Sequence, residues 1–198
     1  GLGLSGITDE NISVSIQLSA SDIDGDNLTY SLLSDATNGS ITIEGQLATY
    51  VPTDYYYGAD EFTFQVSDGE LTDNASVSLF VNAVNDAPVL ATLDNVSFDE
   101  DSSGGVTLSA TDIDGDDLTY NVTTGADIVA TLEGTDLSFS APADFNGTEN
   151  FTVSVTDGDL TDSQVLTVTI AAVNDAPIAS TDLSGETSEG VSITIQLS

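Results

Sequence analysis

The sequence of 198 residues contains no Lys, Arg, His, Cys, Met or Trp. Without His or Cys it cannot form a Ser/His/Asp triad, a Cys/His dyad or a zinc site with the usual nitrogen and sulfur ligands. Without Lys it has neither a Schiff-base amine nor a P-loop. Without Lys or Arg no patch can neutralise phosphates, so neither nucleic acid nor anionic lipid is an expected partner. Two kinds of chemistry remain: acid/base work by carboxylates and binding of hard cations by carboxylates.

All charged side chains are acidic, and the 34 Asp and Glu residues give a formal charge of −34. A compact chain with this charge and no internal cation repels itself. Such a chain either stays disordered or folds with cations supplied from outside, and a hydrophobic content of 39% favours folding. No apolar run is long enough to span a membrane. The abrupt start and end are typical of an excerpt from a longer protein, and no signal peptide is visible.

The chain repeats itself at intervals of 89 or 90 positions. Asp-Ile-Asp-Gly-Asp-Asn-Leu-Thr-Tyr at 22–30 returns with one change at 112–120, and Val-Asn-Asp-Ala-Pro at 84–88 returns at 173–177. A third copy begins near the end of the chain and stops after its first predicted strand. These matches predict a first repeat over 1–87, a second over 88–176 and the opening of a third over 177–198.

Within a repeat, apolar and polar residues alternate with a period of two, as in half-buried strands. The alternation is clear over 12–18, 62–67, 76–81 and 151–155, and Asn-Gly, Glu-Gly or Asp-Gly pairs separate the runs. About seven short strands in about 90 residues, without helical spacing, predict a two-sheet antiparallel β-sandwich. The Ala-Pro steps predict stiff, extended boundaries between repeats.

Each repeat carries an Asp-x-Asp-Gly-Asp loop after its first predicted strand. The glycine allows a tight bend, and several carboxylates with nearby carbonyls are the oxygen ligands that Ca²⁺ prefers. The alternative for any one loop is a solvated turn in which Asp caps its own backbone. Recurrence of the loop in a chain without cations favours metal. The loop acids are Asp22, Asp24 and Asp26, and Asp112, Asp114 and Asp116.

Other acids and amides recur at fixed places in each repeat, each with a simpler structural interpretation beside the metal one. One Asp follows a predicted strand and precedes Gly, as in an ordinary hairpin turn. An Asn-Asp pair precedes each Ala-Pro step, as in a polar linker, and one Glu precedes the first strand, as in a solvated loop. These residues are Asp68 and Asp157, Asn85, Asp86, Asn174 and Asp175, and Glu10 and Glu100.

The order Glu, Asp-x-Asp, Asp-Gly and Val-Asn-Asp-Ala-Pro resembles a cadherin repeat, and more closely the bacterial cadherin-like tandem repeats of large secreted adhesins. The resemblance implies an all-β fold of tandem Ig-like/cadherin-like antiparallel Greek-key β-sandwich domains arranged end to end, with Ca²⁺ between successive domains. The sequence departs from the cadherin pattern at Ala83, where cadherins have Asp. About one or two ions per junction are therefore expected.

The resemblance also distributes the ligands over the junctions. It assigns Glu10, Asn85, Asp86, Asp112, Asp114 and Asp157 to the first junction, and Glu100, Asn174 and Asp175 to the second. Asp22, Asp24 and Asp68 would face a preceding repeat. Asp26 and Asp116 could instead form an ion site within a repeat, and the sequence does not choose between these arrangements.

The leading functional hypothesis is a calcium-rigidified extender module of an extracellular bacterial adhesin or surface filament. Its expected partners are neighbouring repeats, with like chains or a surface glycan as further possibilities. The alternative is a carbohydrate-binding module that uses Tyr55, Tyr56 and Tyr57 for stacking. A glycosidase with two carboxylates is disfavoured because the acids recur with the repeat and a sandwich of this size offers no deep cleft.

Overall fold

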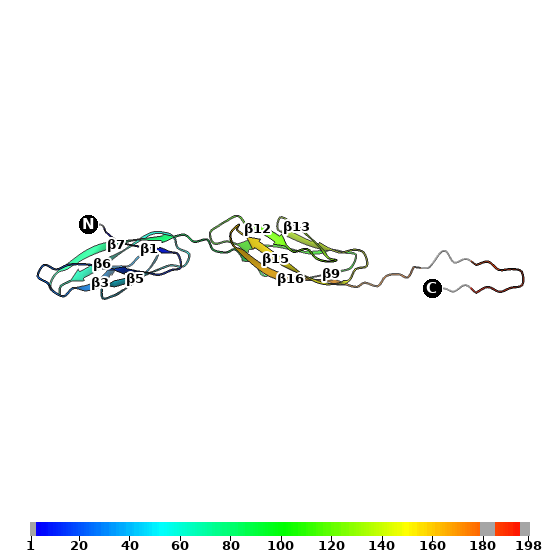
Figure 1. The fold of residues 1–198 in the computed structure, drawn as a ribbon, viewed down its shortest axis with the longest axis horizontal. Coiled ribbons are helices and arrows are strands. Elements are labelled where there is room, and N and C mark those ends of the chain that lie inside the picture. The colour runs from blue at the N-terminus through cyan, green and yellow to red at the C-terminus, as the bar shows by residue number, and fades with distance from the viewer. Residues whose placement is uncertain (1–2, 179–184, 195–198) are drawn as a thin grey trace. The chain divides into compact units, whose positions relative to one another are not determined.

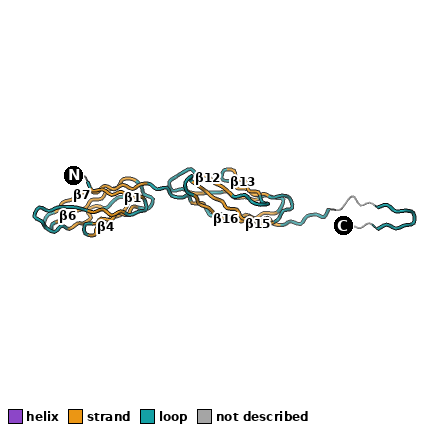
Figure 2. Tube along the Cα trace, in the orientation of Figure 1, coloured by secondary structure: helices purple, strands orange, loops and turns teal. Residues whose placement is uncertain are grey.

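The protein is described from a computed structural model, over residues 3–178 and 185–194. Within these residues every regular element is a strand, which confirms the all-β prediction (Figures 1 and 2). The chain forms two compact units. Among the described residues, the first unit contains 3–89, 111–118 and 156–161, and the second contains 90–110, 119–155, 162–178 and 185–194.

The first repeat forms two sheets, ordered β1-β7-β6-β3 and β2-β5-β4. The inward positions of the predicted alternation form the core, since Phe62, Phe64 and Val77 are each at most 1% exposed. The alternation predicted from Ile12 begins only at Val14, and Ile12 is exposed. The strands are β1 (Leu4–Asp9), β2 (Val14–Gln17), β3 (Thr29–Ser34), β4 (Gly39–Glu44), β5 (Leu47–Pro52), β6 (Gly58–Ser67) and β7 (Thr72–Asn82).

The second repeat has the same two sheets, ordered β9-β16-β15-β12 and β10-β14-β13, and a short β8-β11 pair. Phe139 and Phe151 meet at its centre with their rings 5.0 Å apart. The strands are β8 (Val89–Leu90), β9 (Val96–Asp99), β10 (Gly104–Thr107), β11 (Ala110–Thr111), β12 (Thr119–Val122), β13 (Val129–Glu133), β14 (Asp136–Ser140), β15 (Gly147–Thr156) and β16 (Thr161–Ala171).

One strand pair in each repeat is parallel, unlike the antiparallel pairing expected throughout. Strand β1 runs parallel to β7, with Gly6 opposite Leu79, and β9 runs parallel to β16, with Ser97 opposite Thr169. In both cases the strand that precedes the buried Glu lies beside the last strand of the same repeat. As a result, Glu10 and Glu100 lie next to the segments that leave β7 and β16.

A buried carboxylate fastens one loop in the first sandwich. Asp60 accepts hydrogen bonds from the backbone amides of Thr37 at 3.0 Å and Asn38 at 2.8 Å, and from the Tyr50 hydroxyl at 3.0 Å. Burial pushes the pKa of Asp60 upward, but the hydrogen bonds outweigh it and hold the pKa below its usual value. Burial and the bond to Asp60 raise the pKa of Tyr50.

The second sandwich repeats this arrangement with Glu149, 89 positions after Asp60. Its carboxylate accepts from the amides of Ala126, Asp127 and Ile128 at 2.8 to 3.2 Å. These bonds, led by that from Asp127, lower the pKa of Glu149. Both acids therefore have a structural role.

The predicted third repeat over 177–198 lies partly outside the described residues. Within 185–194 the chain has a turn at Glu189–Gly190 and no strand. The third repeat therefore stays a prediction, as do the boundaries at 87/88 and 176/177.

Candidate metal centre

The Asp-x-Asp-Gly-Asp loop of the second repeat is folded around its first carboxylate. Asp112 Oδ1 accepts from the amides of Asp114 at 2.9 Å, Gly115 at 3.0 Å and Asp116 at 3.4 Å. Gly115 has φ = +81°, a conformation in which a side chain is strained. The bend leaves Asp112 Oδ2 free of these bonds and brings oxygens of the three loop acids within 4.8 Å of one another.

The equivalent loop of the first repeat folds in the same way. Asp22 Oδ1 accepts from the amides of Asp24, Gly25 and Asp26 at 2.8 to 3.2 Å. Within the described residues, however, Asp22, Asp24 and Asp26 do not form a group of converging oxygens. The loop conformation is therefore local, and convergence of its acids depends on more than the motif.

A second acidic group in the first unit joins three residues that are far apart in the sequence. Oxygens of Glu10, Asp86 and Asp114 lie within 4.8 Å of one another. Glu10 is only 3% exposed, and its Oε1 accepts from the Val84 amide at 2.6 Å. Asp114 Oδ2 accepts from the Asp86 amide at 2.8 Å. These bonds connect the acids to the linker that carries Asp86.

Two carboxylate oxygens in this region are buried and have no hydrogen-bond partner: Asp86 Oδ2 and Asp112 Oδ2. A buried anionic oxygen without a donor is costly, so such a pair calls for a cation or water. Desolvation raises the pKa of Asp116, with further contributions from the charges of Asp112, Asp114 and other neighbouring acids. The donors are all oxygen, as Ca²⁺ requires, and the chain has no cation of its own. The residues therefore fit a calcium ion.

Asp157 completes the acids around this linker in the first unit. Its Oδ1 accepts from the amides of Asp159 and Leu160 at 2.7 Å, and its Oδ2 accepts from the Asn85 amide group at 3.0 Å. The bond from Leu160, followed by that from Asn85, lowers the pKa of Asp157. Asp68 accepts the same two turn bonds in the first repeat, from Glu70 and Leu71 at 2.7 Å.

In the second unit the structure forms a different group. Glu100, 8% exposed, accepts from the Val173 amide at 2.6 Å, as Glu10 does from Val84. Beside it, oxygens of Asp101, Asp144 and Asp175 converge within 4.8 Å. The charge of Asp144 is the largest cause of a raised pKa at Asp175, followed by desolvation and the charges of Glu100 and Asp101.

The sequence analysis missed Asp101 and Asp144. Both have a left-handed backbone, with φ = 63° and 59°, and Asp101 Oδ1 accepts from the Asp144 amide at 3.2 Å. The first repeat has Asn11 and Tyr55 at these places, with the same bond at 2.9 Å. The replacement of Asn11 by Asp101, 90 positions later, was a signal in the sequence, whereas the equivalence of Tyr55 and Asp144 is visible only in their shared backbone conformation.

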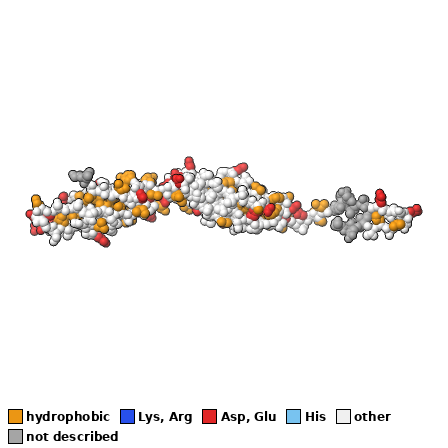
Figure 3. All heavy atoms as spheres, viewed as in Figure 1, with side chains coloured by type: hydrophobic (Ala, Val, Ile, Leu, Met, Phe, Trp, Pro, Cys, Tyr) orange, Lys and Arg blue, Asp and Glu red, His pale blue; other side chains and the backbone are white. Residues whose placement is uncertain are grey.

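The predicted site residues therefore divide into three sets. The structure brings together Glu10, Asp86 and Asp114, and also Asp112, Asp114 and Asp116, with Asn85 bonded to Asp157. It places Glu100 near Asp175, while the Asn174 amide group donates to the Asp175 carbonyl at 3.2 Å. The third set does not converge in the described residues and consists of Asp22, Asp24, Asp26 and Asp68. Figure 3 shows Asp and Glu as the only charged side chains in view.

The sequence model of the bacterial Ig domain family matches residues 4–80 and again 85–169. The chain belongs to this family. The two tandem copies confirm the Ig-like repeat prediction, and the matched ranges include every strand of both repeats except the last two residues of β7 and of β16.

Three individual proteins are also similar to the chain. Chitinase A of Pseudoalteromonas piscicida is 30% identical over 150 residues, which are 73% of this chain and 18% of the enzyme. The chain thus spans less than a fifth of that relative. Human protocadherin-24 EC1-2 has a TM-score of 0.50 at 17% identity and covers 86% of this chain and 94% of its own. The protocadherin GammaB4 extracellular domain has a TM-score of 0.52 at 16% identity, over 86% of this chain and 31% of its own.

The TM-scores to the two protocadherins show a shared cadherin-like fold. The described residues contain no helix that is long and apolar enough to cross a membrane.

Proposed function

We propose that the chain is a non-catalytic, calcium-stiffened spacer of an extracellular bacterial protein, such as an adhesin or a surface filament. The observation that carries this proposal is the pair of buried, unpartnered oxygens of Asp86 and Asp112 beside the buried carboxylate of Glu10. One of these acids lies on the linker itself, so an ion held here would immobilise the segment that connects two repeats.

The ligands of the ion would be Glu10, Asp86, Asp112 and Asp114, with Asp116 as a further ligand. Without an ion these carboxylates repel one another, because no positive side chain lies among them. Bound Ca²⁺ supplies charge neutralisation and six to eight oxygen bonds. The folded state would gain RT ln(1 + [Ca²⁺]/Kd), about 2.7 kcal/mol at a hundredfold excess over Kd.

We infer an extracellular location from the calcium affinity expected of such a site. Extracellular modules bind Ca²⁺ with Kd values of about 10⁻⁴ to 10⁻³ M, so they fill outside the cell and stay largely empty at cytosolic concentrations. Membership of the bacterial Ig domain family supports the same location.

Calcium titration by calorimetry tests the proposal. The EDTA-treated chain should bind Ca²⁺ with a Kd of about 10⁻⁴ to 10⁻³ M and bind Mg²⁺ more weakly, since Mg²⁺ keeps its waters. Asp114→Asn should remove the tightest phase, because Asp114 belongs to both acidic groups. Glu44→Gln, at the exposed end of β4, is the matched control and should bind as the unaltered chain does. If the unaltered chain showed no heat of calcium binding, the proposal would be refuted.

A second candidate function is carbohydrate binding by two aromatic side chains. Tyr55 and Tyr57 are 50% and 59% exposed, while Tyr56 packs against the core and donates to the Ala59 carbonyl at 2.6 Å. The similarity to a chitinase supports this candidate. A chitin pulldown should retain the chain and lose it in Tyr55→Ala and Tyr57→Ala. Equal recovery of all three proteins would exclude these side chains as a sugar platform.

A further inference from the structure

The outward face of the sheet β1-β7-β6-β3 in the first repeat carries a row of apolar side chains. Ile7 of β1 and Ala59 of β6 both lie opposite Phe80 of β7 in the strand register. Ile7 is 67% exposed and Phe80 is 50% exposed, and Ala59 is also exposed. We call these three residues the apolar row. Figure 3 shows hydrophobic side chains, in orange, on the surface of the first repeat over β7.

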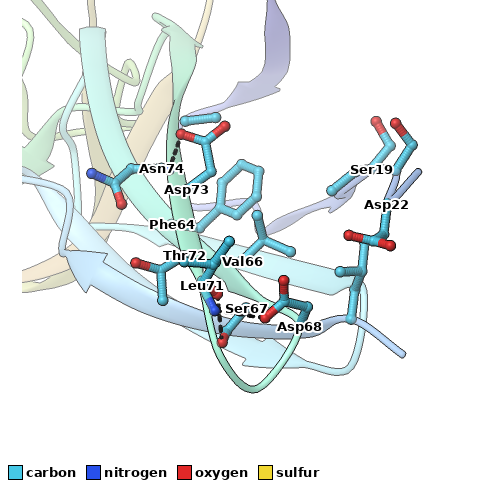
Figure 4. A pocket seen from close by; sticks show the side chains of 14 residues that line it. Ser19, Asp22, Phe64, Val66, Ser67, Asp68, Leu71, Thr72, Asp73 and Asn74 are labelled. Carbon is cyan, nitrogen blue, oxygen red and sulfur yellow. Dashed lines mark hydrogen bonds between the residues drawn. The ribbon is translucent and has the colours of Figure 1, made fainter. Parts of the chain in front are cut away.

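The turn between β6 and β7 fixes the register that directs Phe80 outward. Ser67 Oγ donates to the Leu71 carbonyl at 3.0 Å, and Asp68 Oδ1 accepts from the Leu71 amide at 2.7 Å (Figure 4). Because successive side chains of a strand point to opposite faces, the buried Leu79 lies in the core and Phe80 lies outside it. The apolar row is therefore not part of the core, and contiguous apolar side chains on a surface are typical of an interaction site.

The second repeat has polar side chains at all three equivalent positions. Ser97, Thr148 and Thr169 follow the members of the apolar row by 89 or 90 positions. Ser97 lies opposite Thr169 in the register of β9 and β16, and the Thr148 hydroxyl donates to the Thr169 hydroxyl at 3.3 Å. The same sandwich thus forms with a polar row, so its fold does not depend on apolar side chains at these positions.

Two exposed acids lie in the rows on either side of the apolar row. Asp9 is two positions after Ile7 on β1, and Glu61 is two positions after Ala59 on β6, which runs in the opposite direction. Rows that are two residues apart along a strand are separated by about 7 Å. Each acid accepts one side-chain hydrogen bond through one oxygen, at 2.9 and 3.3 Å, and within the described residues its other oxygen accepts none. The face therefore presents an acid, an apolar row and an acid in sequence.

We propose that this face of the first repeat binds a basic, extended segment of another protein that presents arginine, an apolar side chain and arginine at every second position. The apolar side chain packs on Ile7 and Phe80, because alternate residues of an extended segment share the row spacing of about 7 Å. The two guanidinium groups donate to Asp9 and Glu61. Arginine suits these contacts because its planar group donates two N–H groups to one carboxylate and also stacks on an aromatic ring such as that of Phe80.

Charge distinguishes between the occupants that this face could accept. The chain has 34 acidic side chains and no basic one, so a second copy would bring only like charge to Asp9 and Glu61. A neutral apolar partner would take both carboxylates out of water without a counter-charge. A basic segment neutralises both acids and also covers the apolar row. This binding site goes beyond the proposed spacer function and needs no metal.

The probe is a fluorescently labelled peptide, Gly-Arg-Arg-Val-Val-Arg-Arg-Gly, which presents arginine, valine and arginine on each of its two faces when it is extended. Fluorescence anisotropy against the full chain, in about 0.15 M salt with excess Ca²⁺ and again with EDTA, should show saturable binding. A peptide with glutamine in place of every arginine should bind about tenfold more weakly or worse. A peptide with serine in place of both valines should bind about threefold more weakly or worse, because it buries less apolar surface.

Variants of the chain locate the contact, since any basic peptide is attracted by the net negative charge. The double variant Ile7→Ser, Phe80→Thr copies the polar row of the second repeat without changing the charge, and it should bind the peptide about tenfold more weakly. Glu61→Gln should weaken binding about threefold or more. Glu44→Gln removes the same charge at the exposed end of β4 and should leave the affinity unchanged.

The reverse substitutions test the same contact in the second repeat, which already has Asp99 at the position equivalent to Asp9. Ser97→Ile, Thr169→Phe and Asn150→Glu, added to the double variant, install an apolar row and the second acid there. These substitutions should restore most of the lost affinity, which no folding defect imitates.

Four results would each overturn the proposal: equal binding of the arginine and glutamine peptides, equal affinity of the unaltered chain and the double variant, equal effects of Glu61→Gln and Glu44→Gln, or no gain in the second repeat. Dimerisation of the unaltered chain in sedimentation that is lost in the double variant would assign the face to a second copy and overturn it too. Retention by a neutral polysaccharide with the same loss would assign the face to a sugar instead. Each comparison is made with and without Ca²⁺, so its failure is distinguishable from failure of calcium binding.

Discussion

Replacing Glu10 by Gln should reduce the calcium response of the first unit while changing its stability in EDTA only slightly. The substitution keeps the side-chain volume and an oxygen that can accept from the Val84 amide. It removes one charge from a group whose oxygens lie within 4.8 Å. The first unit should therefore lose a ligand charge and retain its fold.

The expected change in the free energy of unfolding in EDTA is the sum of two opposing effects. At 4.8 Å two carboxylates repel by about 1 kcal/mol in water and about 3 kcal/mol at an effective dielectric constant of 20. Because Asp114 is exposed and Asp86 half-buried, we expect relief of about 1–2 kcal/mol in EDTA. The hydrogen bond from Val84 becomes a neutral one and loses about 1 kcal/mol. The free energy of unfolding in EDTA should thus change by less than about 1 kcal/mol.

In the presence of calcium, the unaltered chain and Glu10→Gln should differ in their free energy of unfolding. At a hundredfold excess over Kd the unaltered site contributes about 2.7 kcal/mol. A tenfold to hundredfold loss of affinity leaves about 1.4 to 0.4 kcal/mol at the same calcium concentration.

The assay is urea unfolding, monitored by circular dichroism and tyrosine fluorescence, with Ca²⁺ and with EDTA. Glu44→Gln controls for loss of a charge elsewhere and should keep the full calcium increment. An increment in Glu10→Gln equal to that of the unaltered chain would show that Glu10 is not a ligand.

Three further perturbations test separate parts of the structure. Tyr50→Phe removes the donor to Asp60 and should lower the free energy of unfolding by about 1–2 kcal/mol in urea, whereas an unchanged midpoint would contradict the buried bond. Asp112→Asn keeps the acceptor for its loop amides but loses the anionic Oδ2, so calorimetry should show about tenfold weaker calcium binding with unchanged loop amide exchange; unchanged affinity would exclude this oxygen. Because the pKa of Asp60 is lower in the folded chain than in the unfolded chain, ionised Asp60 stabilises the fold. This contribution to the free energy of unfolding is complete above about pH 4 and is lost as the pH falls through the pKa of Asp60 in the folded chain. In EDTA, Asp60→Asn should therefore flatten the decline of the urea midpoint below about pH 4, and an unchanged decline would contradict this.

The strands and the core were predictable because one face of each strand is buried. Alternation with a period of two identifies inward side chains such as Phe62 and Phe64 whatever their partner strands are. It contains no information about strand direction, so the parallel pairing of β1 with β7 was not predictable. That pairing depends on where the chain returns in space.

The candidate site was predictable where its geometry is local. The Asp112 loop is closed by bonds to residues two to four positions ahead, and spacing alone reveals such a loop. Asp101 and Asp144 are 43 positions apart and meet only through the folded sandwich. Conversely, the motif at Asp22 forms its loop but does not bring its acids together in the described residues, although the same motif at Asp112 does.

Stiffening of the linker by calcium is the central claim, and a distance distribution between the two repeats tests it most directly. The chain has no cysteine, so Thr42→Cys and Thr131→Cys, both exposed strand positions 89 residues apart, provide two unique spin-label sites. Pulsed electron paramagnetic resonance should give a broad distribution in EDTA and a single narrow one in Ca²⁺, with Glu10→Gln staying broad at the same concentration. A distribution of the same width in EDTA and in saturating Ca²⁺ would contradict the account.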